Sequence, residues 1–336
     1  MNIFAYRLPR RARFLCACSE SLYKGIHPDC FVIAPFDPAE GGCLSIPFER
    51  RLTLDQLDGE LDRCYAGGDD TAPALPVAST TRDEHRAQAE AIIAEIRSGR
   101  LEKCVLARVI TGEARISASR MLTVLSDAYP DAFVFMFHTP EAGTWIGATP
   151  EVLVERYFDR WRTMALAGTR PAGDLSLWSK KDIHEHEVVR RYIQSVLERN
   201  ADDVKAKGMK LLVAGPVEHM MSRFSFRVPA GGSIGDIVAA LSPTPALAGL
   251  PQREAISLIK TTENFTRGYY GGYCGAYSEN GDLRLFVNLR SMRWEPSRYC
   301  LYVGGGIMGD SDPDAEWEET RRKAQTLLDV METCRR

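Results

Sequence analysis

Apolar and polar positions follow two patterns along this chain. Short runs rich in β-branched and aromatic residues, bounded by Gly, Pro, Asn or Asp, are typical of strands, whereas apolar positions that return every three or four residues predict helices. The predicted strands cover residues 13–18, 30–33, 104–111, 133–138, 145–148, 152–157, 161–166, 210–214, 223–228, 269–277, 283–292 and 298–303.

Five segments have the helical pattern, at residues 52–65, 81–98, 183–200, 234–241 and 312–333. The second opens with a capping box, Thr81-Arg-Asp-Glu84, and is closed by Gly99. Runs of adjacent strands interrupted by a few helices favour an α+β fold with mostly antiparallel sheets over a regular βαβ repeat. The stretch 66–80, rich in Gly, Pro, Asp, Ser and Thr, is the one convincing linker or long loop.

Composition narrows the class of protein but supplies no chemistry. The 336 residues are 45% hydrophobic and 26% charged, with a net charge of −3, as in soluble globular proteins. Such a length allows two domains or one large sandwich. We expect no nucleic-acid partner, because Lys and Arg are not in excess, and no membrane span or secretory signal. Nine scattered cysteines without a C-x-x-C pair are expected to be small buried hydrophobes in a cytoplasmic protein.

Two predicted helices carry carboxylates in line with apolar residues. Glu316 and Glu319 share a face with Lys323 in the last helix, and Glu185 lies on the apolar side of the helix at 183–200. The alternatives are a solvated helix start for the first pair and a capping box with Asp182 for Glu185. If the three carboxylates converge, they would suit a hard cation such as Mg²⁺ together with an anionic substrate.

The neighbouring histidines do not suggest zinc. His184 and His186 stand two positions apart on a helix and therefore point to opposite sides, which is the wrong geometry for chelation.

Lys103 opens a predicted strand, and alternation places it on the face of Val105, Ala107 and Val109 or at its rim. Burial favours the neutral amine, which can act as a general base, and the alternative is a lysine that snorkels from a strand end.

The glycines at 304, 306 and 309 match G-x-G-x-x-G. We reject a dinucleotide fold, because the chain ends with the next helix and has no second parallel strand or acidic residue beyond it. The glycines still allow an anion to approach the backbone closely.

Taken together, nine stretches within residues 81–333 resemble the chorismate-utilising enzymes, which include isochorismate, salicylate, anthranilate and aminodeoxychorismate synthases. They occur in the order found in that family. The stretches are Glu-Lys103-Cys-Val-Leu-Ala-Arg108, Ile-Gly-Ala-Thr-Pro-Glu151, Leu-Ala-Gly168-Thr-Arg-Pro171, Lys-Asp-Ile-His-Glu185-His-Glu, Ser-Pro-Thr-Pro-Ala246-Leu-Ala-Gly, Arg-Gly-Tyr-Tyr270-Gly-Gly, Val-Asn-Leu-Arg290, Val-Gly-Gly-Gly306-Ile, and Ser-Asp-Pro-Asp-Ala-Glu316-Trp-Glu-Glu319-Thr-Arg-Arg-Lys323.

The resemblance implies a role for each matching position. Lys103 corresponds to the base that activates water for attack at C2 of chorismate, and Glu151 to the acid that protonates the departing C4 hydroxyl. Glu185, Glu316 and Glu319 correspond to a Mg²⁺ site that holds the ring carboxylate. The positions that match other contacts to substrate are Gly168, Thr169, His219, Ala246, Tyr270, Arg290, Gly304, Gly306 and Lys323.

Three positions distinguish between the activities found in this family. Lys103 stands where amine-adding anthranilate synthases usually have Gln, and Ala167 where aminodeoxychorismate synthases often have Lys, so water is the expected nucleophile. Ala246 stands where salicylate synthases tend to have Thr, which favours isochorismate as the final product. Ser242 departs from the His that many relatives carry before Pro-Thr-Pro. The alternatives are a salicylate synthase, which goes on to eliminate pyruvate, and a non-catalytic relative that binds chorismate.

The same resemblance implies one large sandwich of two stacked antiparallel sheets with helices outside. Residues 1–80 would be a variable N-terminal segment packed on this sandwich, and 81–336 the chorismate-binding catalytic domain. The expected partner is chorismate, with the product used for menaquinone or a catecholate siderophore, and the expected assembly is a monomer or weak homo-oligomer.

Overall fold

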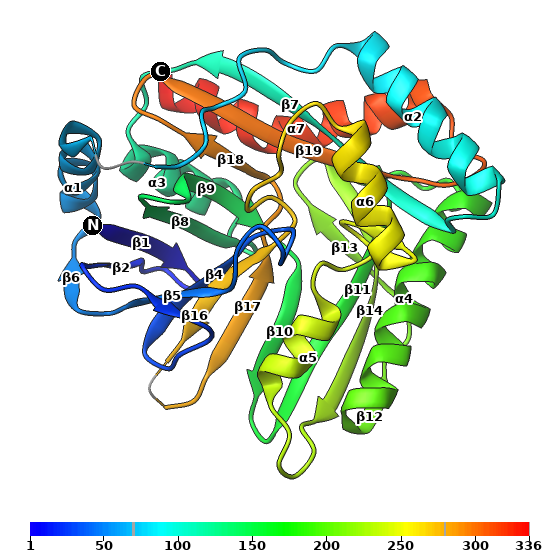
Figure 1. Cartoon of the computed structure of the whole chain (residues 1–336), viewed down its shortest axis with the longest axis horizontal. Helices are drawn as coiled ribbons and strands as arrows, with labels where there is room; N and C mark the ends of the chain where they lie inside the picture. Colours follow the sequence, from blue (N-terminus) through cyan, green and yellow to red (C-terminus); the bar gives the residue numbers. More distant parts are fainter. Residues whose placement is uncertain (69–70, 279, 336) are drawn as a thin grey trace.

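Two large antiparallel sheets form the centre of the protein in the computed structural model (Figure 1). It describes residues 1–68, 71–278 and 280–335, so positions 69 and 70 of the predicted linker and the last residue of the predicted catalytic domain lie outside the described residues. The expected α+β fold with two antiparallel sheets is confirmed.

The first sheet has nine strands. In spatial order they are β15 (Gly249–Leu250), β7 (Lys103–Glu113), β19 (Arg298–Ile307), β18 (Ser291–Trp294), β9 (Gly143–Thr149), β8 (Phe133–Thr139), β1 (Asn2–Arg7), β2 (Leu15–Ser19) and β6 (Arg50–Leu52).

The second sheet has ten strands. In spatial order they are β12 (Asp202–Ala206), β14 (Val217–Arg227), β11 (Arg160–Pro171), β10 (Val152–Tyr157), β17 (Leu283–Val287), β16 (Tyr273–Tyr277), β4 (Cys30–Ala34), β5 (Leu44–Pro47) and β3 (Tyr23–Lys24), with β13 (Lys210–Ala214) also paired to β14.

Seven helices are present in the described residues. They are α1 (Leu54–Gly67), α2 (Arg82–Arg97), α3 (Ala118–Ala128), α4 (Lys180–Asn200), α5 (Ile234–Leu241), α6 (Gln252–Thr262) and α7 (Pro313–Arg335).

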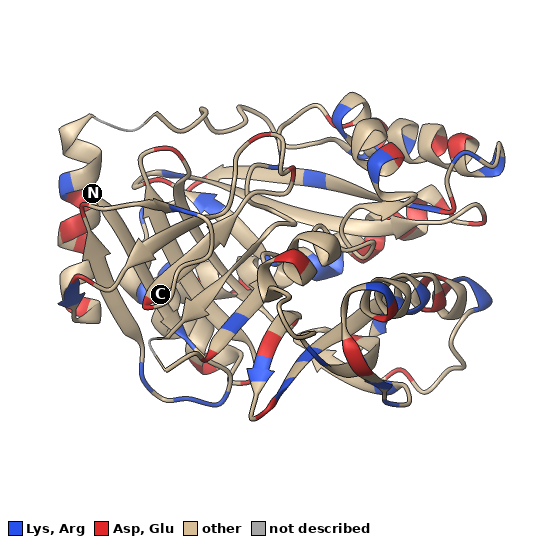
Figure 2. Cartoon of the chain, turned by 60° about the horizontal axis from the view of Figure 1, so that its bottom comes forward, with Lys and Arg blue, Asp and Glu red and all other residues tan. Residues whose placement is uncertain are grey.

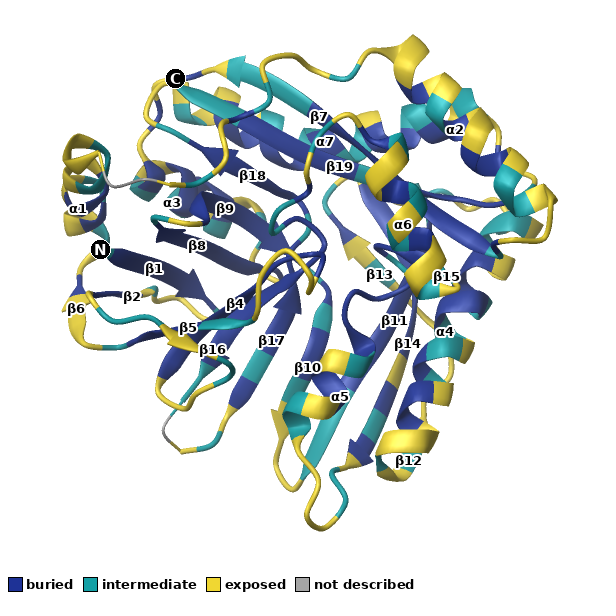
Figure 3. Cartoon of the chain, viewed as in Figure 1, coloured by how far each residue is buried: buried dark blue, intermediate teal, exposed yellow. Residues whose placement is uncertain are grey.

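Strand alternation explains how the sheets stack. In β8, Phe133, Phe135 and Phe137 point into the core between the sheets, and Phe133 stacks on Phe286 of the opposite sheet with ring centroids 4.1 Å apart. The intervening Val134 and Met136 point outward to helices α3 and α7. Both faces are therefore buried, which is why β8 reads as a continuous apolar run (Figure 3).

Further helices cover the β7 end of the first sheet and the β11–β14 part of the second. Helices α2 and α6 pack on the face of β7 that carries Cys104 and Leu106, and α4 packs against β11 and β14. The capping box predicted at Thr81 is present: the Thr81 side chain accepts from the Glu84 N–H, and the Glu84 carboxylate accepts from the Thr81 N–H.

Two of the short segments that carry the chain from one sheet to the other position functional residues. Pro150 and Glu151 link β9 of the first sheet to β10 of the second, and Asn288–Arg290 link β17 back to β18. The predicted single strand at 283–292 is therefore wrong: Arg290 has φ +49°, and the Asn288 backbone bonds to the 271–272 turn instead of a strand.

Other differences from the expectation are local. Strand β1 and helices α3 and α6 were not anticipated, and the predicted strand at 269–277 begins only at Tyr273, because a turn occupies residues 268–271. The first 80 residues contribute strands to both sheets, and the division at residue 80 stays a prediction. None of the nine cysteines, all of which lie in the described ranges, forms a disulfide bond. No helix in the described part of the chain is long and apolar enough to span a membrane.

Candidate active site

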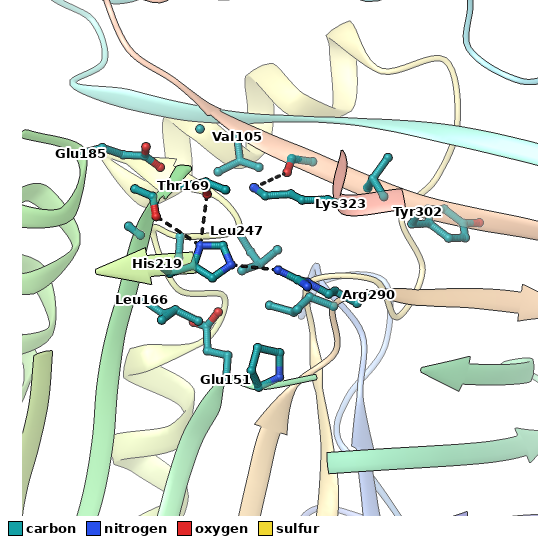
Figure 4. Close-up of a pocket in the computed structure, with 18 of the residues that line it drawn as sticks. Val105, Glu151, Leu166, Thr169, Glu185, His219, Leu247, Arg290, Tyr302 and Lys323 are labelled. Atoms are coloured by element: carbon teal, nitrogen blue, oxygen red, sulfur yellow. Dashed lines mark hydrogen bonds between the residues drawn. The ribbon is translucent and has the colours of Figure 1, made fainter. Parts of the chain in front are cut away.

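One cavity between the sheets brings together most of the residues singled out from the sequence (Figure 4). Lys103, Glu316 and Glu319 are not part of its lining but adjoin it, as described below. The predicted residues that line it are Glu151, Gly168, Thr169, Glu185, His219, Ala246, Tyr270, Arg290, Gly304, Gly306 and Lys323.

Glu151 is a buried carboxyl group on one wall. It follows the Thr149-Pro150 crossover, and only 3% of the residue is exposed. Burial raises its pKa to about 8, although Lys103 and Lys323 act in the opposite direction. Glu151 therefore holds its proton at neutral pH, which is the state that a general acid needs.

His219 and Arg290 form a buried hydrogen-bonded pair. The His219 Nε2 lies 2.8 Å from Nη2 of Arg290, and its Nδ1 lies 3.2 Å from the Gly168 carbonyl and 3.1 Å from the Thr169 hydroxyl (Figure 4). Because guanidinium only donates, Nε2 must accept, and Nδ1 carries the proton that it donates to Gly168. Burial and the adjacent Arg290 hold the pKa of His219 well below its usual range, so the ring is neutral and positions the guanidinium.

Arg290 is further held from its other side. Its Nη1 donates to the Ala214 carbonyl at 2.6 Å and to the Thr326 hydroxyl at 3.2 Å. An arginine oriented in this way, with no acidic partner among the described residues, is suited to a substrate carboxylate.

Three carboxylates and three lysines form three ion pairs at the end of the cavity next to α4 and α7. Lys103, which is fully buried on the face that alternation predicted, lies 2.9 Å from Glu185. Lys323 lies 2.7 Å from Glu319 and also donates to the Gly304 carbonyl at 3.0 Å. The third pair, Lys181 and Glu316, is separated by 2.5 Å.

The charges in this cluster set the protonation of the acids. Burial opposes ionisation of Glu185 and Glu319, but the nearby lysines outweigh it and hold both pKa values below the ordinary one. Burial prevails at Glu316 and raises its pKa to about 7, despite Lys181. The capping-box alternative for Glu185 is wrong, because Ser179 caps α4.

The donor set fits a divalent cation in its chemistry. The three carboxylates are close enough to influence each other, and Oε2 of Glu316 is buried without a hydrogen-bond partner. As the side chains stand, each carboxylate faces a lysine, and no three acidic, His or Cys side chains in the described ranges have a metal-holding arrangement. A cation bound here would therefore displace lysine contacts.

Glycines 304–306 of β19 leave the space that this cluster occupies. A Cβ on Gly306 would lie 2.1 Å from Oε1 of Glu185 and 3.0 Å from Cε of Lys103. A Cβ on Gly305 would approach Glu316 Oε2 to 3.2 Å. The first two glycines of the G-x-G-x-x-G match thus belong to a strand that must pass close to carboxylates, and Gly309 lies in the turn that follows, so the match is not a dinucleotide loop.

Sequence reasoning missed Lys181 and the apolar lining. Lys181 stands four positions before Glu185 on α4, and that spacing was the available signal for a lysine on the same helix face. The apolar members of the lining were not singled out, because nothing in a strand pattern separates them from other core residues. They are Val105, Leu166, Leu247, Leu289, Tyr302 and Val303.

Comparison with known proteins identifies the class to which this fold and site belong. The family model of chorismate binding enzymes matches residues 66–332, and the chain belongs to this family. Isochorismate synthase EntC of Escherichia coli (strain K12) is 29% identical over 322 residues, which cover 88% of this chain and 79% of EntC. The salicylate biosynthesis isochorismate synthase of Pseudomonas aeruginosa is 32% identical over 283 residues, 77% of this chain and 58% of that protein.

The fold is also that of a solved structure. DhbC from Bacillus anthracis superposes with a TM-score of 0.81 at 23% identity, covering 98% of this chain and 96% of that one.

Proposed function

We propose that this protein is an isochorismate synthase, which isomerises chorismate by adding water at C2 and releasing the C4 hydroxyl. The observation that carries the proposal is a pair of buried side chains at one cavity: Glu151 lines it, and Lys103 adjoins it beside Glu185. Burial raises the pKa of Glu151 to about 8, which suits an acid. The names of relatives such as EntC support it. Substitution across a ring needs a base and an acid of this kind.

In the proposed mechanism, the neutral amine of Lys103 accepts a proton from water as the water oxygen bonds to C2. The ammonium form that pairs with Glu185 cannot do this, so Lys103 first gives that proton to solvent. The ring double bonds shift, the C4–O bond breaks, and Glu151 gives its proton to the departing hydroxyl. One water enters and one leaves, so the product is an isomer. Both side chains then regain their starting states by proton exchange with solvent.

The remaining lining residues orient the substrate. Arg290 and Lys323 offer charged donors to its carboxylates, and Gly304 and Gly306 let these groups approach the backbone. Thr169 and Tyr270 supply hydroxyls, while His219 acts through Arg290. Glu185, Glu316 and Glu319 would hold Mg²⁺, which would neutralise the ring carboxylate.

The second candidate is a salicylate synthase, in which pyruvate leaves after the isomerisation. Ala246 lines the cavity, and its small side chain is the basis on which we favour isochorismate as the final product.

The deciding experiment incubates the purified protein with chorismate and Mg²⁺ and separates the products by chromatography. Isochorismate alone is expected. Salicylate with pyruvate would replace the first proposal by the second, and absence of turnover would leave a chorismate-binding protein without this activity.

A further inference from the structure

The cavity described above, for which we propose chorismate as the ligand, is called the chorismate cavity from here on. A second, larger cavity lies next to it and contains an arginine that the proposed reaction does not use. Its volume is about 1010 Å³. Tyr302 lines both cavities, but Arg293 lines only the second.

Arg293 occupies an unusual place for a charged residue. It belongs to β18, where alternation sends Met292 and Trp294 to the outer, helix-covered face. Arg293 therefore points to the inner face, where its cross-strand partners Trp145 and Cys300 belong to the core between the sheets. Only 6% of the residue is exposed. A charge buried to this extent is costly unless something pairs with it.

The structure supplies no such partner in its described part. Nη1 of Arg293 donates to the Pro73 carbonyl, and Nε is buried without a hydrogen-bond partner. Of the two acids that line the cavity, Glu40 is paired with Lys260 at 3.2 Å, and Glu141 is exposed at the rim. Nε lies against Gly143 and is closed to the cavity, so a ligand carboxylate would be met by Nη2, which makes no hydrogen bond to a described residue.

The other walls indicate what the carboxylate would be attached to. Four aromatic side chains line the cavity: Trp145, Phe265, Tyr269 and Tyr302. Trp145 lies 6.1 Å from Tyr269 and 5.2 Å from Tyr302, measured between ring centroids. Aromatic walls favour a flat ring that can stack or meet them edge-on.

We propose that this cavity is a second ligand site, which binds a small aromatic carboxylate through Arg293 with the ring against these aromatic walls. It is separate from the chorismate cavity, and its test does not depend on catalysis.

The test is isothermal titration calorimetry of the full-length protein with sodium benzoate, with benzamide as the neutral probe of the same shape. Benzoate is expected to bind, and benzamide to bind at least about tenfold more weakly, as for loss of a charged hydrogen bond. Arg293→Met should weaken benzoate binding by about tenfold or more while chorismate turnover persists. Equal binding of the two probes, or unchanged benzoate binding in Arg293→Met, would refute the site.

Two further variants test whether benzoate binds in this cavity or in the chorismate cavity. Gly42→Phe adds a ring to the lining of the cavity at a position where a Cβ meets nothing within 4 Å, leaves Arg293 itself unchanged, and should also weaken benzoate binding. Lys323→Met alters only the chorismate cavity and should leave benzoate binding intact. Benzoate binding that is lost in Lys323→Met but kept in the other two variants would place the probe in the chorismate cavity and overturn the proposal.

Discussion

Glu151→Gln keeps a buried side chain of the same size at this position but removes its ability to ionise and to donate a proton as an acid. Glutamine has almost the same shape as a protonated glutamate, so the buried site stays filled. It carries no proton that it could release to a leaving hydroxyl, and it cannot ionise. Two consequences follow, one for the pH dependence of stability and one for turnover.

The structure gives the size of the first effect. The pKa of Glu151 rises from 4.5 to about 8, which corresponds to about 5 kcal/mol between the two protonation states. Because the folded state binds this proton more tightly than the unfolded chain, the stabilisation is full below pH 4.5 and is lost as the pH rises through about 8. Between pH 5 and pH 7 the wild-type protein should lose about 2–3 kcal/mol from this group alone.

Urea unfolding of both proteins at pH 5, 7 and 9 measures the difference. The stability of Glu151→Gln relative to wild type should rise by about 2–3 kcal/mol from pH 5 to pH 7, and shared groups such as Glu316 cancel in the comparison. Parallel pH curves for the two proteins would show that burial does not raise the pKa of Glu151, and the reasoning would fail.

The second effect concerns the reaction. Without its acid the variant should lose about 10²–10⁴-fold in kcat, with a smaller change in KM. The wild-type kcat/KM should fall as the pH rises above about 8, because Glu151 then loses its proton. A variant with wild-type kcat would remove Glu151 from the mechanism.

Four other perturbations test the remaining parts of the site. Lys103→Ala should abolish turnover with an unchanged circular dichroism spectrum, and retained activity would exclude it as the base. EDTA should abolish turnover and added Mg²⁺ restore it, whereas indifference to EDTA would contradict the carboxylate site. Ala246→Thr should raise pyruvate release in a coupled lactate dehydrogenase assay, and no change would show that this position does not control the product. Gly306→Ala should lower kcat by about 100-fold, because its Cβ would lie 2.1 Å from Glu185 Oε1; unaltered kinetics would mean that the cluster tolerates the displacement.

The local sequence pattern was enough to predict most helices and strands, because the features that form them lie within the same segment. Strands such as Phe133–Thr139 are buried on both faces and read as apolar runs, and the helix after Thr81 carries its own cap. The sequence rule failed at residues 283–292, where one predicted strand is in fact two strands that belong to different sheets. The predicted strand is interrupted where Arg290 makes long-range hydrogen bonds to Ala214 and Thr326. The alternation of residues along a strand cannot predict such contacts.

The sequence predicted which residues belong to the candidate site, but it did not predict how their side chains pair with one another. Glu185 and Glu319 lie in different helices, and their alignment with apolar stripes already indicated that they face inward. Their pairing with Lys103 and Lys323, and the part played by Lys181, depend on how α4 and α7 approach the first sheet. Charge is interspersed over helices and loops in Figure 2, so capture of a dianionic substrate rests on these local groups.

By itself, the sequence determined the α+β class, most strands and helices, and which side chains could carry chorismate chemistry, since residue type, periodicity and motif order are properties of the chain. Only the tertiary structure decided which charges neutralise each other, that neutral His219 orients Arg290, and that Arg293 is buried without an ion-pair partner among the described residues. Protonation and pairing depend on burial and on neighbours from distant segments, and those exist only after the two sheets have closed on each other.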